Sequence, residues 1–407
     1  NQKVINLNKH VSDYSRFTNK LCYDLMTQIP DMISLRTQFV HLYVKDMTEG
    51  GSGEFEDYGL YTQVEQLNKR ALKSHGLDKN GQLYKVNYFE FYRYPDVIRL
   101  KSDADYDVEA FEEMLEIKGN DDHSKLIEML DDVNDYSVSI DDIMDKWFCE
   151  DNLFSWLAFH ILMGNIDTQS RNVFLYSPLN SSTWYFISWD NDGAFSTSRN
   201  ARNRDTAGWE TGVSNYWGNV LFRRILLDSD MRQKLDDKIE EYVKFIDEEK
   251  LNELIDVYEP VVEEYSFKEP DLEHMSFDID GYREYVKTMA KETQLNYASY
   301  KESLKKPMPF YIGKPQPDDG GLKLIWDASY DFDAENVYYT VEISDDYSFE
   351  NPVVKAENLY VTEYTADVLL ESGQYFIKVM ARNESGMEQS AFDYYLSNRN
   401  GRIYGVK

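Results

Sequence analysis

Two short stretches decide the fold: residues 164–172, Gly-Asn-Ile-Asp-Thr-Gln-Ser-Arg-Asn, and residues 189–192, Trp-Asp-Asn-Asp. Before the first stretch, Ile140–Met163 is apolar almost all round in its second half, which predicts one central buried helix ending at Gly164. Between the two stretches, residues 172–176 and 184–188 predict a pair of strands joined by a turn. The order is therefore buried helix, polar loop, strand, turn, strand and second polar turn.

The polar loop places Asp167 five positions before Asn172. In protein kinases an Asp and an Asn at this spacing share one loop, where the Asp accepts the proton of the substrate hydroxyl and the Asn holds Mg²⁺. The same spacing recurs by chance in this acidic, Asn-rich chain, for example at Asp247 and Asn252. Taken alone, Asp167 is therefore better explained as a turn residue at the exit of the helix.

The order of the elements favours the kinase interpretation, because Asp190 then takes the place of the metal-binding Asp of the kinase Asp-Phe-Gly motif. Two neighbouring carboxylates raise each other's pKa, and a bound cation removes that conflict. Mg²⁺ prefers a few carboxylate or carbonyl oxygens with phosphate oxygens and water, which Asp190, Asn172 and ATP supply. Asp192 is either a second metal ligand or a turn residue before Gly193. Metal-dependent hydrolysis is disfavoured, because no cluster of His or Glu completes such a site.

The composition narrows the function further. The 407 residues include 43 basic and 74 acidic side chains, a formal charge of −31, and 42% are hydrophobic. This composition predicts two or three packed domains, and the negative charge argues against binding to nucleic acid or anionic membranes, which depends on Lys and Arg contacts to phosphate. Membrane insertion is not expected, because the longest helix-like apolar stretch, Leu153–Met163, is too short to span a bilayer. From Asp103 to Asp145 there are 16 acidic residues against 2 lysines, either a solvated helical face or a docking surface for a basic protein substrate. Cys22 and Cys149 are expected as buried free thiols.

Hydrophobic spacing predicts further elements on both sides of the central stretches. Strands are expected at residues 39–44 and 58–64, and the Gly-rich segment 50–53 between them fits a hairpin tip without a phosphate. Helices are expected at residues 13–28, 68–75, 105–118 and 124–133, and in several segments from 220 to 304.

The C-terminal part has a different pattern. Prolines predict a linker over residues 307–320. Beyond it the hydrophobic period changes to two, and about seven short strands predict a β-sandwich over residues 321–398, with a tail at 399–407. Residues 370–375, Leu-Glu-Ser-Gly-Gln-Tyr, resemble the tyrosine corner of fibronectin type III domains, and Trp326 lies where their early-strand Trp is found.

Ordered pieces of residues 3–304 resemble the CotH kinase family, first named for a bacterial spore-coat protein. The pieces are Ile5–Leu21, Tyr58–Glu65, Leu83–Lys85, Gly164–Tyr176, Ser188–Asp192 and Asn219–Leu227. The resemblance implies an atypical kinase fold and ATP-dependent phosphorylation of Ser or Thr in proteins, with Mg²⁺ or Mn²⁺. Carried over by position, it makes Asp167 the catalytic residue and Asn172 and Asp190 the metal ligands.

The resemblance also implies nucleotide contacts at Glu65, in the inter-lobe hinge, and at Lys85. Glu65 fits a structural hinge role as well, and Lys85 fits a solvated lysine. Family members carry, before the piece that matches Ile5–Leu21, strands with an Arg-Gly loop and a phosphate-contacting lysine, so a truncated N-lobe is expected. The expected fold class is α+β: a kinase-like bilobal domain over residues 1–306, with N-lobe and hinge to about residue 100 and a mainly helical C-lobe after it, followed by the all-β sandwich.

Two functions follow from these expectations. The first is a metal-dependent Ser/Thr kinase of a protein substrate, where a basic, Ser-rich protein would suit the acidic stretch. The second is a kinase-derived scaffold or adhesion protein without catalysis, whose β-sandwich binds a protein or carbohydrate. A fibronectin-type module on a bacterial-looking kinase favours an extracellular or spore-surface location. The sequence begins at Asn1 without a leader, as expected of a mature or trimmed form.

Overall fold

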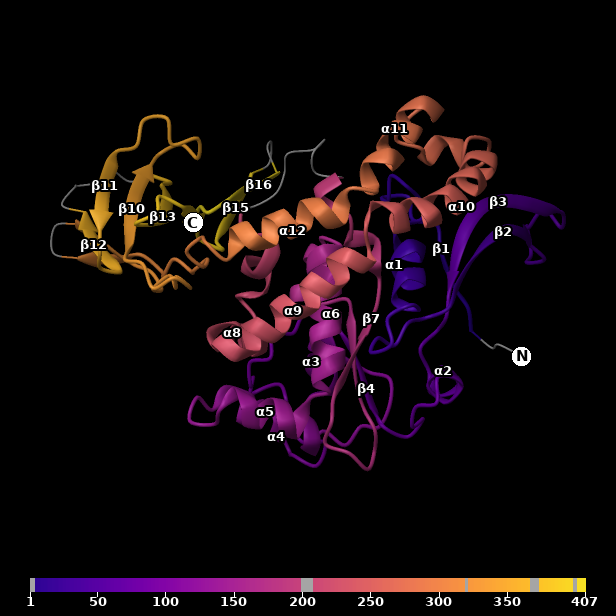
Figure 1. Cartoon of the computed structure of the whole chain (residues 1–407), viewed down its shortest axis with the longest axis horizontal. Helices are drawn as coiled ribbons and strands as arrows, with labels where there is room; N and C mark the ends of the chain where they lie inside the picture. The colour runs from indigo at the N-terminus through magenta and orange to yellow at the C-terminus, as the bar shows by residue number, and fades with distance from the viewer. Residues whose placement is uncertain (1–3, 199–207, 319–320, 367–372, 398–400) are drawn as a thin grey trace. The chain divides into compact units, whose positions relative to one another are not determined.

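The computed structural model describes residues 4–198, 208–318, 321–366, 373–397 and 401–407. The chain forms two compact units: Asn1–Arg202 with Asn219–Tyr297, and Asn203–Gly218 with Ala298–Lys407. The first unit combines helices with two antiparallel sheets, and the second contains the sheets of a β-sandwich (Figure 1). The fold class is therefore mixed α+β, a kinase-like domain and a β-sandwich.

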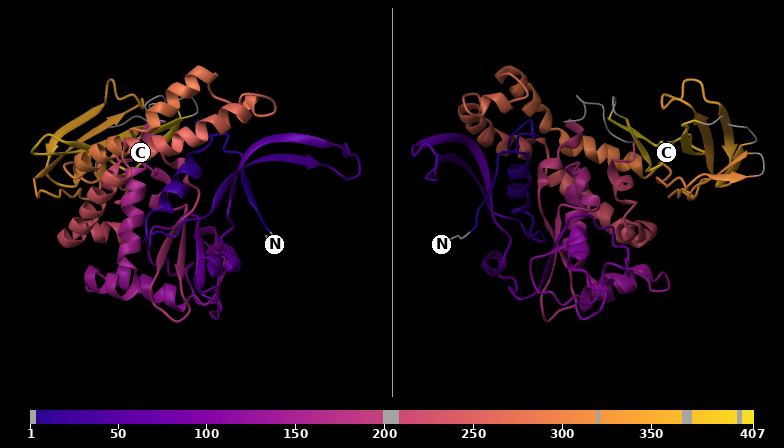
Figure 2. Two further views of the ribbon diagram at one scale, coloured as in Figure 1. Left: turned by 45° about the vertical axis from the view of Figure 1, so that its right-hand side comes forward. Right: turned by 180° about the vertical axis from the view of Figure 1, so that it is seen from behind.

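The N-terminal sheet of the first unit has three strands, β1 (Asn6–Asn8), β3 (Phe55–Val64) and β2 (Thr37–Lys45), in that order. All of its neighbours are antiparallel. β2 and β3 form the predicted hairpin, which extends away from the body of this unit with the Gly-rich turn at its tip (Figures 1 and 2). The glycines of residues 50–53 thus have the turn role that the sequence predicts.

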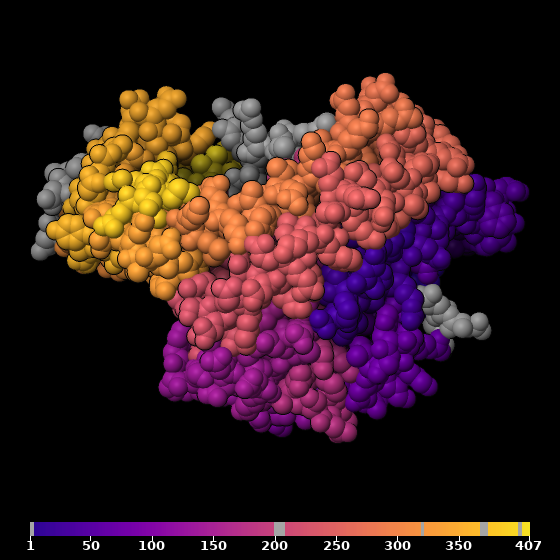
Figure 3. All heavy atoms as spheres, in the orientation of Figure 1, coloured from indigo at the N-terminus to yellow at the C-terminus, as the bar shows by residue number. Residues whose placement is uncertain are grey.

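Helix α1 (Thr18–Met26) lies beside this sheet and inside the predicted helical segment 13–28. Its apolar face, including Leu21 and Leu25, is completely buried. Tyr258, on α10 (Glu248–Ser266), packs its ring 5.6 Å from Phe17 and 5.7 Å from Phe39 of β2. In the space-filling view of Figure 3, the salmon-coloured surface lies directly against the indigo surface of the N-terminal residues. Apolar packing therefore holds α1 and the hairpin in place.

The second sheet contains four strands in the order β5 (Leu115–Ile117), β4 (Gln82–Val86), β6 (Val173–Ser177) and β7 (Tyr185–Ser188). Its register pairs Lys85 with Phe174 and Val173 with Ser188. The strand pair predicted at residues 172–176 and 184–188 is confirmed. β6 is buried along its whole length, which places the ends of β6 and β7 against the interior of the unit.

The central helix differs from its prediction in one respect. The segment Ile140–Met163 is two helices, α5 (Ile140–Trp147) and α6 (Glu150–Leu162), with extended backbone between them. The break occurs because Phe148 forms a parallel bridge with Trp184, and the Cys149 N–H donates to the Trp184 carbonyl at 3.0 Å. α6 is buried on all sides, as predicted. The expectation of one continuous helix was wrong because strand-like pairing takes the backbone groups that a helix needs.

The remaining helices of the first unit mostly agree with the predicted segments. The helix expected at residues 105–118 is shorter, because α3 (Val108–Met114) ends where residues 115–117 pair with β4 as β5. No helix in the described part of the chain is both long and apolar enough to cross a bilayer. Cys22 is buried, Cys149 is half-buried, and both are free thiols. The other helices are α2 (Lys69–Ser74), α4 (Ser124–Asn134), α8 (Val220–Leu227), α9 (Ser229–Phe245), α11 (Ile279–Met289) and α12 (Glu292–Ser303).

Three sheets form the second unit in the described residues, and the inner faces of the two larger ones share one apolar core. Phe310 and Ile312 belong to that core, and Ile312 pairs with Trp326, so the proline-rich segment expected as a linker is packed. The segment expected as a tail pairs with β15 through β16. Residues 370–372 of the proposed tyrosine corner lie outside the described residues. The sheets are β11 (Val354–Leu359), β10 (Val337–Ser344), β13 (Phe376–Asn383) and β14 (Glu388–Ser390); β12 (Glu363–Ala366), β9 (Gly321–Ile325) and β8 (Gln316–Asp318); and the pair β15 (Tyr394–Ser397) and β16 (Gly401–Tyr404).

Candidate active site

A tight turn after the central helix displays Asp167. α6 ends at Leu162, and Gly164 follows with a left-handed φ of 56°. A Cβ on Gly164 would lie 2.7 Å from the Asn296 side chain and 2.9 Å from that of Glu292. The Asn165 N–H then donates to the His160 carbonyl at 3.0 Å. Residues 166–169 form a 3₁₀ turn that carries Asp167 outward. A buried helix with a glycine exit thus fixes the backbone that presents this carboxylate.

Asn172 and Asp190 are in direct contact at the adjoining ends of β6 and β7. The Asn172 side-chain amide donates to the Asp190 carbonyl at 3.2 Å, and the Trp189 N–H donates to the Asn172 carbonyl at 3.0 Å. Both Asn172 and Asp190 have left-handed backbone, with φ of 59° and 51°. Such conformations are uncommon for residues other than glycine, and they cluster at functional sites. The amide nitrogen of Asn172 is engaged, which leaves its oxygen as the ligand atom.

Asp167 also packs against the turn that follows β7. A Cβ on Gly193 would lie 2.6 Å from Asp167 Oδ2 and 3.1 Å from Asn165 Oδ1, so a larger residue there would displace the Asp167 carboxylate. The four residues Asp167, Asn172, Asp190 and Asp192 therefore gather where two loops meet, and we call this group the aspartate site. The structure brings together the side chains that the sequence predicts for catalysis and metal binding.

The electrostatics of the aspartate site reflect crowded negative charge. Burial raises the pKa of Asp190, the Lys85 ammonium opposes that shift, and the Asp167 carboxylate adds to it. Burial, with the neighbouring Asp190 carboxylate, raises the pKa of Asp192 to about 6, against an ordinary value of 3.8. A raised carboxyl pKa means that the ionised form is disfavoured, here first by burial and then by the neighbouring carboxylates. A cation bound among these oxygens would relieve that excess of negative charge.

Two basic side chains lie next to the carboxylates. Lys85, on β4, places its ammonium 5.9 Å from the centre of the Trp189 ring. Arg171 forms an ion pair with Asp167 and donates to the Tyr88 hydroxyl at 3.2 Å. Sequence reasoning singled out Lys85 and missed Arg171. The position of Arg171, one turn after Asp167 and directly before Asn172, was the available signal.

Helix α1 holds the second loop of the site. The Asn191 N–H donates to Asn19 Oδ1 at 2.9 Å, and the Tyr23 hydroxyl donates to the Ser188 carbonyl at 3.4 Å. Asn19 is almost completely buried. Neither Asn19 nor Tyr23 was predicted. Both contact a loop that is distant in the sequence, and no local pattern indicates such a contact.

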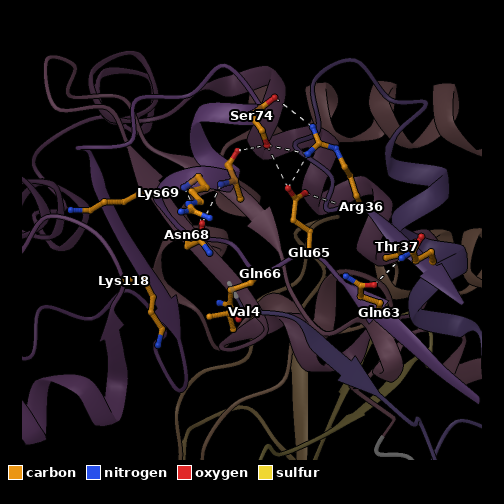
Figure 4. A pocket seen from close by; sticks show the side chains of 13 residues that line it. Val4, Arg36, Thr37, Gln63, Glu65, Gln66, Asn68, Lys69, Ser74 and Lys118 are labelled. Carbon is orange, nitrogen blue, oxygen red and sulfur yellow. Dashed lines mark hydrogen bonds and ion pairs between the residues drawn. The ribbon is translucent and has the colours of Figure 1, made fainter. Parts of the chain in front are cut away.

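Glu65 has different surroundings from the aspartates. Its Oε1 accepts from Arg36 at 3.0 Å and its Oε2 binds the His75 ring at 2.8 Å. It lines a pocket of about 820 Å³ at the end of β3, which we call the hinge pocket. Figure 4 shows Arg36 and Ser74 joined to Glu65 on one side of this pocket, with Lys69 and Lys118 on the other. These contacts support the structural reading of Glu65.

The donor set of the aspartate site fits a hard divalent cation. Carboxylate and amide oxygens are the ligands that Mg²⁺ prefers. The amide oxygens of Asn165 and Asn191 are buried there without a hydrogen-bond partner. Within the described residues, no three His, Cys, Asp or Glu side chains form a metal cage by themselves. The oxygens that could hold such a cation are the carboxylates of Asp190 and Asp192 and the amide oxygen of Asn172.

A buried helix, a loop with Asp and Asn, a strand pair and a second Asp define a kinase-like protein. The family model described as CotH kinase protein matches residues 1–303. The chain belongs to the CotH kinase family. A search of curated proteins found no match.

Proposed function

We propose that this protein transfers the γ-phosphate of ATP to Ser or Thr hydroxyls of a protein substrate, with Mg²⁺ or Mn²⁺. The observation that carries the proposal is the convergence of Asp167, Asn172 and Asp190 where two loops meet. The family is kinase-like, and a metal held between Asp190 and Asn172 would neutralise phosphate charge.

In this proposal Asp167 orients the attacking hydroxyl and accepts its proton, since a carboxylate on a tight loop can reach a group placed beside the phosphate. Arg171 holds Asp167 in position before substrate binds. Lys85 supplies positive charge near Asp190. Asn19 keeps the loop of residues 190–192 in place through Asn191. Each of these groups acts by position and charge, which is how most phosphoryl transfer is accelerated.

The substrate class follows from charge. The acidic stretch from Asp103 to Asp145 covers α3, α4 and α5, and many of its carboxylates are exposed. A basic, Ser-rich protein would be attracted to this face over roughly a Debye length of ~8 Å at physiological salt. An extracellular or spore-surface location and a ligand for the β-sandwich stay predictions from the resemblance.

The test is transfer of radiolabelled γ-phosphate to a basic Ser-rich protein or to the protein itself. We expect transfer that requires Mg²⁺ or Mn²⁺ and is lost in Asp167→Asn and Asp190→Asn. Equal transfer by these variants would reject the assignment of the site. Absence of transfer, together with absence of ATP binding, would favour a non-catalytic scaffold.

A further inference from the structure

The hinge pocket is lined mainly by basic side chains, although the chain as a whole is acidic. Its lining includes Arg36, Lys69, Arg70 and Lys118 but only one carboxylate, that of Glu65. The whole chain carries a formal charge of −31. Because acidic residues outnumber basic ones by 74 to 43, four basic side chains around one carboxylate are unexpected at random. The excess positive charge points to an anionic ligand.

The Glu65 carboxylate of the hinge pocket is already bound to neighbouring side chains. One oxygen of Glu65 accepts from Arg36, and the other binds His75. Lys118 forms an ion pair with Glu116, whose side chain is 36% exposed and hence a weak competitor. Lys69 is exposed and makes no ion pair in the described part of the chain. Within the described residues, the Lys69 ammonium is therefore a positive charge of the pocket that no carboxylate neutralises.

Amide groups add hydrogen-bonding capacity to this charge. Gln66 and Asn68 line the same pocket, and Gln63 hydrogen-bonds to Gln38 across β2 and β3 at 2.8 Å. A volume of about 820 Å³ suits a compact ligand rather than a polymer. The acidic chain as a whole would repel nucleic acid. The ligand is therefore small or is one side chain of a larger partner.

We propose that the hinge pocket binds a phosphate monoester, with a phosphorylated Ser or Thr side chain of a protein as its source. A phosphate monoester carries a charge of about −1.5 to −2 and three acceptor oxygens, which suits several basic side chains better than a carboxylate does. Such a site would retain a protein that has already been phosphorylated. The binding does not depend on catalysis at the aspartate site.

The experiment is isothermal titration calorimetry of the whole chain without ATP or metal. The probes are a neutral peptide with one phosphoserine, the same peptide with serine, AMP and inorganic phosphate. We expect the phosphoserine peptide to bind at least about tenfold more tightly than the serine peptide, with affinity falling as salt rises. AMP and inorganic phosphate distinguish a nucleotide or free-phosphate source from the peptide.

The variant Lys69→Gln with Lys118→Gln should weaken binding of the phosphoserine peptide at least about tenfold. Lys73→Gln is the matched control, because Lys73 is exposed on the same helix but does not line the pocket. Thermal unfolding checks that each variant folds. Equal binding of the two peptides, or equal binding by the double variant and the control, would overturn the proposal. Tighter binding of AMP than of the peptide would overturn the peptide source and assign the pocket to nucleotides.

Discussion

The aspartate site and the hinge pocket are two polar sites of opposite character in one unit. The first gathers carboxylates in a partly buried turn, where burial raises the pKa of Asp190 and Asp192. The second gathers basic side chains around Glu65 in an open pocket of about 820 Å³. Carboxylates therefore outnumber basic side chains at the first site, and basic side chains outnumber carboxylates at the second.

The difference in charge predicts which kind of ion each site binds. Crowded carboxylates are costly until a cation arrives, so the aspartate site favours a metal. Exposed lysines and arginines stay hydrated in the folded protein, so they lower its stability little even when no anion is bound. Substitutions at the first site should thus change both chemistry and stability, whereas those at the second should change ligand binding with only a small effect on stability.

The largest expected effect is loss of chemistry at the aspartate site. Asp167→Asn and Asp190→Asn should each lower phosphoryl transfer by at least about a thousandfold, because one removes the proton acceptor and the other a metal ligand. Transfer of labelled phosphate measures this. The matched control is Asp96→Asn, since the Asp96 side chain is 96% exposed, and its activity should equal that of the unchanged protein. A loss of only a few-fold in the site variants would contradict the assigned roles.

A smaller effect is expected at Arg171. Arg171→Gln should lower kcat/KM by about tenfold to a hundredfold, because Asp167 loses the partner that orients it. Arg171→Lys should restore part of the rate, since it keeps the charge without the planar fork. Measurement of kcat and KM for both variants tests this. An unchanged kcat in Arg171→Gln would show that the ion pair is not part of the working site.

The third effect concerns stability. The carboxyl of Asp192 has a folded pKa of about 6 against 3.8 ordinarily, so its contribution to stability is complete below pH ~4 and is lost as pH rises through 6. Asp192→Asn should therefore raise the free energy of unfolding at pH 7 by about 1–3 kcal/mol and flatten its decrease between pH 4 and 6. Urea unfolding across that pH range measures the free energy of unfolding and its pH dependence. A variant less stable than the unchanged protein at pH 7 would contradict the prediction.

The smallest effect is expected at the hinge pocket. Glu65→Gln should lower the free energy of unfolding by less than about 1 kcal/mol, because the side chain of Arg36, its ion-pair partner, is 62% exposed. Transfer to a substrate should be unchanged. Urea unfolding and the transfer assay at saturating ATP measure the two quantities. A large rise in the KM for ATP would instead support the nucleotide contact implied by the resemblance.

Much of the fold could be predicted because hydrophobic period and glycine positions are local signals. The hairpin around residues 50–53, the buried helix α6 and the strand pair β6–β7 are confirmed. The break between α5 and α6 could not be predicted, since it depends on a bridge from Phe148 to Trp184, 36 residues away. Short β5 was missed for the same reason.

The two sites differ in how much the sequence predicted. Asp167, Asn172, Asp190 and Asp192 lie within 26 residues, so their order along the chain indicated one site. The hinge pocket draws on Arg36, Glu65 and Lys118, which no motif connects. Asn19 was missed likewise, because only the fold brings α1 to the turn after β7. Sequence order finds sites made by consecutive loops and misses those assembled from distant segments.

We propose that Asp190 and Asn172 hold one metal–nucleotide complex and that the hinge pocket takes no part in binding it. Calorimetric titration of Mn²⁺–ATP into the whole chain tests it most directly. We expect one equivalent of Mn²⁺–ATP to bind, with affinity at least about tenfold weaker in Asp190→Asn and in Asn172→Ala and unchanged in Lys69→Gln with Lys118→Gln. Equal binding by the Asp190 and Asn172 variants, with loss of binding in the lysine variant, would contradict it.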